Sequence, residues 1–411
     1  PMQWIKLKKK DCGHGLMPNN LSKISGYINL KSINVSVKYL SISALFTGIG
    51  LGYFFTLMVM ILKHNGYSES MIGLIGASFS FGLMSAGLIV TRILKQIGLY
   101  QTMLLSISVQ TLLVILMFVF FNPIVISISH FIMGLLGGMN WMTMDTWVNV
   151  VSTNKNRGKA IAFYNLSITL GFSIGPLLIS LFGTYGSVPI FLAIFLMIIR
   201  TPVIISIKKY VESVKLPTKD SKLNFSLLKF APFIFLAIFV SGIGDSSFGV
   251  LFPAYMINLE FSDRYIGILL FVALFFGILS QPFVGALTDT INKRVFIFIL
   301  LSFHFAWPLI LHNFYQINLI LFFAVIIWGI AGTSLYTVAL AYLGERYNFK
   351  EIIAATSVFI IVYEAGEFFG PLISGFMMDI FGNIGFIYSV IVPTVMAFAI
   401  GSIRTFYLRK M

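Results

Sequence analysis

Three acidic residues lie near the middle of long apolar stretches of the sequence: Asp245, Glu364 and Glu367. A charged group inside a bilayer costs about 2.5–3.5 kcal/mol on insertion scales, so each of these acids is a candidate for function. Burial in an apolar environment disfavours the charged form of a carboxyl group, and such a group can take up a proton near neutral pH. The acids therefore predict proton binding or contact with a small molecule. The alternative is a neutral hydrogen bond that holds two helices together.

Other chemistry has little support in the sequence. It contains no Gly-x-x-x-x-Gly-Lys-Ser/Thr loop, no nucleophile elbow and no Cys/His cluster, which argues against nucleotide hydrolysis, covalent catalysis and a metal site. Cys12 is the only cysteine, so no intrachain disulfide is possible. His130, His304 and His312 are scattered, and packing positions are favoured over a proton relay. We expect no enzyme and no cofactor.

The composition indicates a membrane protein. The chain is 58% hydrophobic and 10% charged, with a mean hydropathy of +0.94, whereas soluble chains are about 45–50% apolar and about 25% charged. The formal net charge of +14 suggests nucleic-acid binding at first. However, the basic residues lie between apolar segments, so we expect contact with a lipid bilayer and no nucleic acid.

Twelve apolar segments approach the roughly 20 residues that a membrane-spanning helix needs. The fold class is therefore an all-α membrane protein with twelve transmembrane helices. The expected segments are 39–62, 68–91, 99–121, 124–151, 160–182, 188–207, 230–257, 265–288, 295–312, 318–343, 353–378 and 386–404.

The distribution of basic residues predicts the orientation. With twelve crossings, 25 of the 28 lysines and arginines lie on one side, which the positive-inside rule assigns to the cytoplasm. Both termini are then cytoplasmic, and the expected location is the inner membrane of a bacterium. We expect a basic cytoplasmic tail at 1–38, six helices in 39–207, a cytoplasmic linker at 208–229 and six helices in 230–405.

The two halves repeat each other with an offset of 194 or 195 residues. Thr-Gly-Ile-Gly at 47–50 is matched by Ser-Gly-Ile-Gly at 241–244, and 67–73 is matched by 261–267. A tandem repeat of six helices predicts two pseudo-symmetric bundles with a substrate site between them. A Gly-x-x-x-Gly-Pro motif, which permits close helix packing and a kink, also occurs twice. Its residues are Gly171, Gly175, Pro176, Gly366, Gly370 and Pro371.

These features resemble the major facilitator superfamily over almost the whole apolar part of the chain. The signature of that family between its second and third helices is Gly-x-x-x-Asp-Arg-x-Gly followed by basic residues. Here Arg92 is present, but Thr91 replaces the aspartate. The second half keeps Asp289 without the following arginine, and Lys293 and Arg294 come after it. In the family this loop joins the two halves on the inner side, so the resemblance implies gating by these residues, and Asp289 is expected to partner a helix start or Lys293.

A finer resemblance begins with Met-Asp-Thr-Trp-Val-Asn at 144–149, followed by Arg-Gly-Lys at 157–159 and Tyr164. It is similar to a bacterial branch of uncharacterised facilitators that carry Glu-Ser-Trp-Leu-Asn, then Arg-Gly and Tyr. Asp145 stands for the glutamate. Near the inner end of its helix, Asp145 is expected to pair with Arg92 when the inner side is closed, and proton binding is the alternative.

The resemblance implies a secondary active transporter that moves a small organic solute by alternating access. In such a fold, Tyr53, Trp141 and Tyr336 would lie on helices that line the cavity, where their rings stack on substrate or simply pack. Asp245 and Glu364 would meet the same aqueous space and couple transport to protons. We expect a monomer whose partners are a small-molecule substrate and protons.

The direction of transport stays open. The motif in the fifth helix resembles one that is common among drug–proton antiporters, while uptake of a sugar or metabolite is the competing interpretation. The only basic residue inside a segment is Arg200, which is expected to extend to the inner interface, so neutral or cationic substrates fit better than anions. A non-transporting sensor or a pore is the alternative from another class.

Overall fold

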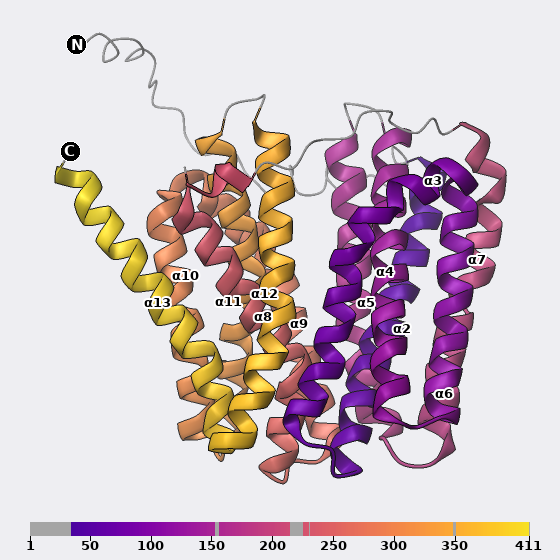
Figure 1. Ribbon diagram of the computed structural model, residues 1–411, viewed down its shortest axis with the longest axis horizontal. Coiled ribbons are helices and arrows are strands. Elements are labelled where there is room, and N and C mark those ends of the chain that lie inside the picture. The colour runs from indigo at the N-terminus through magenta and orange to yellow at the C-terminus, as the bar shows by residue number, and fades with distance from the viewer. Residues whose placement is uncertain (1–33, 153–155, 214–224, 230, 348–350, 411) are drawn as a thin grey trace, which may run out of the picture.

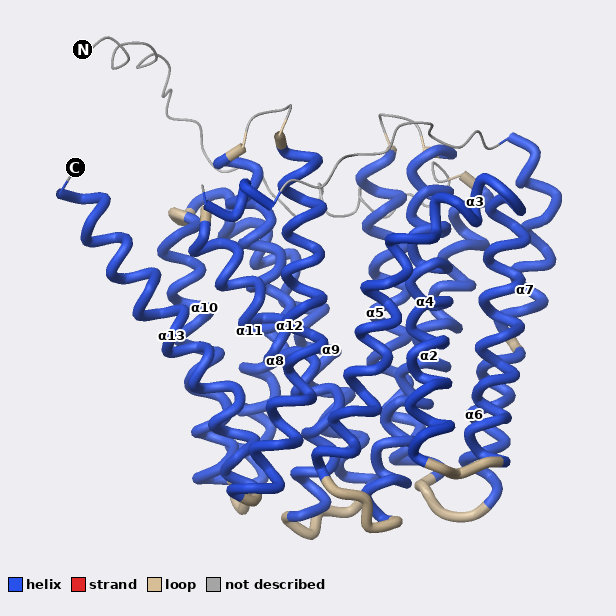
Figure 2. Tube along the Cα trace, viewed as in Figure 1, coloured by secondary structure: helices blue, strands red, loops and turns tan. Residues whose placement is uncertain are grey.

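The computed structural model describes residues 34–152, 156–213, 225–229, 231–347 and 351–410. Most of the expected tail at 1–38 and half of the expected linker at 208–229 fall outside these residues. The described part consists of helices joined by short loops, with no strand (Figure 2).

The helices follow one another as α2 Val35–His64, α3 Glu69–Val119, α4 Pro123–Val151, α5 Arg157–Phe182, α6 Ser187–Ile198, α7 Arg200–Ile207, α8 Pro232–Asn258, α9 Asp263–Thr290, α10 Lys293–Phe314, α11 Asn318–Arg346, α12 Ile352–Phe381 and α13 Asn383–Lys410. Two short 3-10 helices, η2 Lys208–Ser213 and η3 Phe225–Lys229, lie between the halves of the chain.

The number of crossings depends on one glycine. Among the described residues, eleven helical stretches are long and apolar enough to span a membrane, and α6 and α7 together make one of them, Ser187–Tyr210. The 51-residue α3 is broken at Gly98, where φ is 78° and ψ is 174°. Glycine adopts this conformation without a steric penalty, so the chain turns there and α3 crosses twice. The prediction of twelve crossings is confirmed.

The helices form two bundles, α2–α7 and α8–α13, which lie side by side in Figure 1. We call the face where α2 begins and α13 ends the terminal face. The opposite face, which carries the turns at 65–68 and 259–262, is the distal face. The bundles approach each other toward the distal face, the lower edge of Figure 1.

The distribution of the apolar core also differs between the distal face and the terminal face. One cluster of buried side chains runs through the first bundle and continues into the distal portions of α8, α9, α10 and α11. The terminal-face portions of α8, α10 and α11 belong to a second cluster, which contains only residues of the C-terminal half. The two halves therefore share a packed core toward the distal face.

Glycines hold the same helix pairs together in both bundles. A Cβ atom on Gly48 of α2 would lie 2.3 Å from the carbonyl oxygen of Ile168 in α5. At the equivalent place in the second bundle, a Cβ on Gly242 of α8 would lie 2.3 Å from the carbonyl oxygen of Tyr363 in α12. Only glycine allows such close backbone contact, so the repeated glycines position α5 on α2 and α12 on α8.

The Gly-x-x-x-Gly-Pro motifs contribute to contacts within and between the bundles. Gly171 and Gly366 pack against α2 and α8 of their own bundles. The prolines lie toward the other bundle: a Cβ on Gly73 of α3 would lie 2.2 Å from the Pro371 carbonyl oxygen, and one on Gly267 of α9 would lie 2.6 Å from that of Pro176. The interface between the bundles thus has the same approximate two-fold symmetry as the chain.

Candidate functional site

Two helices of the C-terminal half, α8 and α12, bring the predicted acids together. The contact at Gly242 and Gly366 holds the two backbones close, and Asp245 follows Gly242 by three residues on α8. One carboxylate oxygen, Oδ2, accepts hydrogen bonds from the Ser241 hydroxyl (3.2 Å) and from the Tyr363 hydroxyl (3.2 Å). A Cβ on Gly332 of α11 would lie only 2.4 Å from the other oxygen, Oδ1, so a side chain there would displace the carboxylate.

The two glutamates extend this group along α12. Glu367 interacts electrostatically with both Asp245 and Tyr363, and Glu364 lies one turn before Glu367. Glu364 Oε2 is buried and accepts no hydrogen bond from the described residues. None of the three acids forms an ion pair with a described lysine or arginine. A buried carboxylate without a cation is costly, so this arrangement fits groups that bind protons or a cationic ligand.

Aromatic rings border the acids. The Tyr336 ring of α11 lies edge-on to the Tyr363 ring at 5.1 Å between centroids and edge-on to Phe359 at 5.3 Å. Tyr336 also interacts electrostatically with Glu364 and Glu367. We call Asp245, Glu364, Glu367, Tyr336 and Tyr363 the acidic cluster. It provides proton-binding groups beside aromatic surface.

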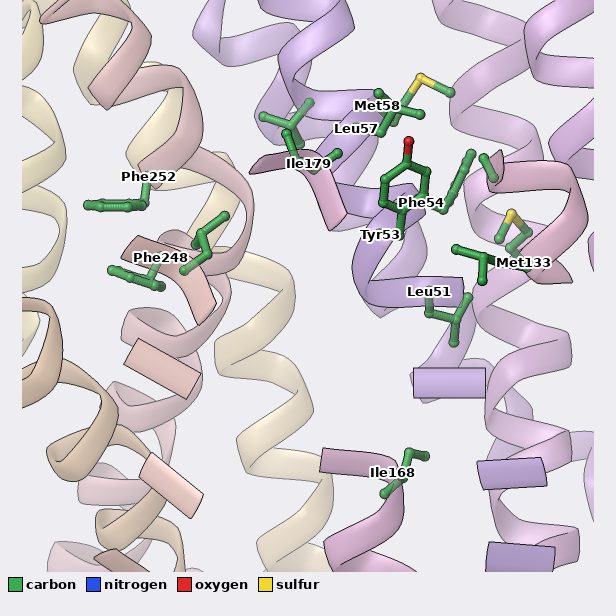
Figure 3. Close-up of a cluster of buried hydrophobic side chains, with 14 of the residues drawn as sticks. Leu51, Tyr53, Phe54, Leu57, Met58, Met133, Ile168, Ile179, Phe248 and Phe252 are labelled. Carbon is green, nitrogen blue, oxygen red and sulfur yellow. The ribbon is translucent and has the colours of Figure 1, made fainter. Parts of the chain in front are cut away.

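Tyr53, in contrast, lies away from the acidic cluster. Its side chain is fully buried inside the first bundle, among Phe54, Leu57 and Met58 (Figure 3). Its hydroxyl donates to the Pro189 carbonyl oxygen at 3.2 Å, at the start of α6. We therefore exclude Tyr53 from the site. A helix that lines a transport path has another face that packs against its own bundle, and Tyr53 lies on that face. Trp141 of α4 is 40% exposed and belongs to the other bundle, where Asp145, one turn further along α4, interacts electrostatically with Tyr336.

The predicted inner gate is not formed between Arg92 and Asp145. The Arg92 side chain is exposed, whereas Asp145 is partly buried beside Tyr164 of α5. No ion pair joins Arg92 to Asp145 among the described residues. The Arg92–Asp145 pair stays a prediction for a state that is closed on the terminal face.

The second gating loop lines a cavity of about 660 Å³ on the terminal face of the C-terminal half. The expectation that Asp289 partners Lys293 is wrong for this state, because the Lys293 ammonium pairs with Glu345 Oε1 at 2.6 Å. Asp289 is exposed. Arg294 donates to the Gly401 carbonyl oxygen at 3.2 Å and lies over the Phe233 ring at 5.6 Å. The start of α10 therefore packs on α11, which carries Glu345, and on α13, which carries Gly401. This packing places the Glu345 carboxylate next to the Lys293 ammonium.

Arg200 also differs from its expected place. The side chain is fully buried instead of extending to the interface, and its Nε donates to the Met197 carbonyl oxygen at 3.1 Å. Of the histidines, His130 and His304 are buried inside the bundles, and His312 contacts the Tyr255 hydroxyl at 3.2 Å. The described residues contain no group of three or more metal-ligating side chains.

A polar group on the distal face was missed by the sequence reasoning. It joins the two bundles through the ends of α2, α5, α8 and α12 and the starts of α3 and α9. Its residues are His64, Glu69, Thr184, Asn258, Asp263 and Asp379. The sequence held a signal, because Glu69 and Asp263 occupy the same place in the matched stretches 67–73 and 261–267.

Comparison with known proteins decides the family. The profile described as Major Facilitator Superfamily matches residues 40–230 and 234–410, which is nearly all of the membrane-spanning chain. The chain belongs to the Major Facilitator Superfamily. It is a multi-pass membrane transporter of that superfamily.

Curated relatives of this facilitator are similar over most of their length. One is the uncharacterised MFS-type transporter YfkF of Bacillus subtilis, 23% identical over 359 residues that cover 84% of this chain and 89% of YfkF. Another is the uncharacterised MFS-type transporter YcaD of Escherichia fergusonii, 25% identical over 337 residues that cover 79% of this chain and 84% of YcaD.

Solved structures show the same fold at low sequence identity. The nucleoside transporter NupG superimposes with a TM-score of 0.72 at 10% identity, over 90% of this chain and 98% of NupG. A bacterial homolog of the human lysosomal transporter Spinster, in an inward-facing and occupied conformation, superimposes with a TM-score of 0.66 at 12% identity, over 91% and 96% of the two chains. The facilitator thus has the fold expected from its repeat.

Proposed function

We propose that this facilitator is a secondary active transporter that moves a small organic solute by alternating access and couples this movement to protons. The observation that carries the proposal is the acidic cluster. Three carboxyl groups lie near the middle of α8 and α12, all three interact with Tyr363, and none forms an ion pair with a described lysine or arginine. A proton or a cationic substrate would supply the missing positive charge.

The arrangement of the bundles supports the proposal of alternating access. We take residues 39–207 and 230–405 as the two moving units and 208–229 as their linker. The contacts described between them are concentrated at the distal face, so the present state is closed there. Rocking the units about the acidic cluster would open the distal face and close the terminal face. The positive-inside count supports a cytoplasmic terminal face. The location in a bacterial inner membrane and the monomeric state are parts of the proposal.

The cluster also favours a class of substrate. Carboxyl groups beside the Tyr336 and Tyr363 rings suit an amphipathic molecule that is neutral or cationic, because rings attract cations and apolar surfaces alike. An anion would meet three acids without a neighbouring base. Efflux by exchange for protons and uptake together with protons both use this arrangement, and the transport assay below separates them.

The test begins with a substrate. Purified protein is screened by thermal shift against neutral and cationic metabolites and drugs across pH, because a ligand stabilises the state that binds it. A hit is then assayed in proteoliposomes with an imposed pH gradient. We expect Asp245→Asn and Glu364→Gln to reduce gradient-driven accumulation at least about tenfold, the effect of losing about 1.4 kcal/mol.

Glu351→Gln is the matched control, since it removes an exposed carboxylate directly before α12, the helix that carries Glu364. This variant should retain most of the accumulation. If both cluster variants kept full pH-driven accumulation, the coupling proposal would be wrong. Steady unitary currents in planar bilayers would instead favour a pore, because a carrier that alternates has no permanent aqueous path.

A further inference from the structure

The distal face holds two hydrogen-bonded arms that cross between the bundles. In the first arm, the His64 imidazole at the end of α2 contacts both carboxylate oxygens of Asp263 at the start of α9, with Nε2 at 2.9 and 3.0 Å. The Thr184 hydroxyl, just beyond α5, also donates to Asp263. Side-chain exposures of 25% for His64 and 10% for Asp263 show a pair that is reached by water but partly shielded.

The second arm repeats the first in the other direction. The Asn258 amide at the end of α8 donates to Glu69 Oε1 at the start of α3 at 2.7 Å. Asn258 corresponds to His64 and Glu69 to Asp263, each with an offset of 194 residues. Glu69 Oε1 also pairs with the Lys63 ammonium at 2.6 Å. Each half thus presents a donor at a helix end and an acid at a helix start.

A third contact follows the same symmetry. Asp379 near the end of α12 accepts hydrogen bonds from the backbone N–H groups of Glu69 (3.0 Å) and Ser70 (3.2 Å) in the first turn of α3. Free N–H groups at a helix start favour a carboxylate. Thr184, 195 residues earlier, occupies the corresponding place in the first half and bonds Asp263. These contacts pull the start of each helix onto the opposite bundle, so together they hold the distal face closed.

The two arms differ in their response to pH. By residue type, histidine changes its charge between pH 5 and 8, whereas an asparagine amide does not titrate. The titratable and charged groups near His64 are Lys63 and Tyr185 in its own half, Glu69 on α3, Glu260 before α9, Asp263 and Arg264 on α9, and Asp379 on α12. Of these types, only the imidazole gains charge in that interval, and it contacts a carboxylate directly.

We propose that His64, Asp263 and Thr184 with Glu69, Asn258 and Asp379 form a distal gate in which one of two equivalent arms senses the pH on that face. The imidazolium strengthens its arm at acid pH, because it gives Asp263 a charge-assisted hydrogen bond. As the pH rises, the imidazole becomes neutral, that arm weakens and the distal face opens more often. The second arm keeps the gate partly closed throughout. The proposal requires the alternating access proposed above but not proton coupling through the acidic cluster.

The experiment measures opening of the gate without a substrate. Spin labels are placed at Phe120→Cys, in the loop after α3, and at Gln316→Cys, in the loop after α10, in a Cys12→Ser background. Both positions are exposed on the distal face of different bundles. Electron–electron distance distributions in lipid nanodiscs then report the open fraction at pH 5.5 and 8.5. We expect the ratio of open to closed molecules to rise about two- to fivefold, as for a partly exposed ion pair.

Because His64 and Asn258 occupy equivalent positions in the two arms, each residue can be changed to the one found in the other arm. His64→Asn makes the first arm like the second, so the gate should still close but lose its pH response. Asn258→His gives the second arm its own titratable donor, so the change in ratio should become roughly the square of the original one. A full pH response in His64→Asn, or an unchanged response in Asn258→His, would overturn the proposal.

A further background separates this gate from the acidic cluster. The combined Asp245→Asn, Glu364→Gln and Glu367→Gln variant should keep the pH-dependent distance change, because these residues lie on the middle turns of α8 and α12. Loss of the response in this background would assign it to the cluster and contradict the gate. If the transport assay showed no proton coupling, the pH-dependent change in the distance between the spin labels should still be observed.

Discussion

At the scale of single residues, the two halves of the chain form the same turn with different residues. The chain between α2 and α3 has φ of 78° at Gly66, and the corresponding position between α8 and α9 is Glu260, with φ of 64°. Both turns are followed by a serine that caps the next helix, Ser68 and Ser262. A glutamate in the left-handed region is strained where glycine is not. The turns precede Glu69 and Asp263, so this strain lies beside the proposed distal gate.

Substitutions at the two equivalent turn positions, Gly66 and Glu260, should change the free energy of unfolding in opposite directions. We expect Gly66→Ala to lower the free energy of unfolding by about 1 kcal/mol, because a side chain is disfavoured at positive φ. Glu260→Gly should raise it by a smaller amount. Reversible unfolding in mixed micelles measures both. Gly158→Ala is the control, since no atom lies within 4 Å of a Cβ there and the residue is helical. Equal effects at Gly66 and Gly158 would contradict this explanation.

At the scale of helices, glycines make close contacts both inside each bundle and between the two bundles. Gly48 and Gly171 join α2 to α5 inside one bundle, and Gly242 and Gly366 join α8 to α12 inside the other. Gly73, in contrast, contacts α12 of the other bundle. The same small residue therefore fixes a bundle in one place and allows the bundles to dock in another.

A substitution at the docking glycine should move the equilibrium between states. A Cβ on Gly73 would lie 2.2 Å from the Pro371 carbonyl oxygen, so Gly73→Ala must push the bundles apart on the distal face. Overpacking costs about 1–3 kcal/mol, and the fraction of molecules with the long distance between Phe120→Cys and Gln316→Cys should rise about tenfold. Thermal stability should change little, because each bundle keeps its core.

Two other glycines test this reasoning. Gly249→Ala on α8 meets no atom within 4 Å and should leave the distance distribution unchanged. Gly171→Ala should instead lower thermal stability, since its Cβ would lie 2.3 Å from the Leu45 carbonyl oxygen inside one bundle. A distance distribution that Gly73→Ala does not alter would argue against docking at this position.

At the scale of the whole molecule, charge and packing point to the same orientation. The two bundles share apolar core and cross-bundle hydrogen bonds at the distal face, while most basic residues of the sequence belong to the loops of the other face. With the terminal side in the cytoplasm, as proposed, a state closed on the distal side is an inward-facing carrier.

The orientation can be measured in intact cells. Single cysteines at Gln316, in the loop after α10, and at Thr290, at the end of α9, lie on opposite faces in a Cys12→Ser background. A membrane-impermeant maleimide added outside should label Gln316→Cys at once and Thr290→Cys only after lysis, because the positive-inside rule places the terminal face in the cytoplasm. The reverse pattern would invert the assigned topology.

The class of fold, the number of crossings and the internal repeat could all be predicted from the order of the amino acids. Hydropathy fixes which segments enter a bilayer, and the period of the glycine motifs marks the helix faces that touch. Asp245, Glu364 and Glu367 were also visible as acids in apolar segments, since a charge in a bilayer stands out whatever its neighbours are.

Which side chains meet became clear from the packed helices alone. Tyr53 turns into its own bundle, Lys293 pairs with Glu345, and His64 contacts Asp263 nearly two hundred residues away. When a long apolar helix is buried on several sides, hydropathy does not show which of its faces packs against which neighbour. Nor does hydropathy identify the hydrogen-bond partner of a polar residue at a helix end. Those choices depend on how two bundles dock, which is a property of their surfaces in three dimensions and not of any one segment.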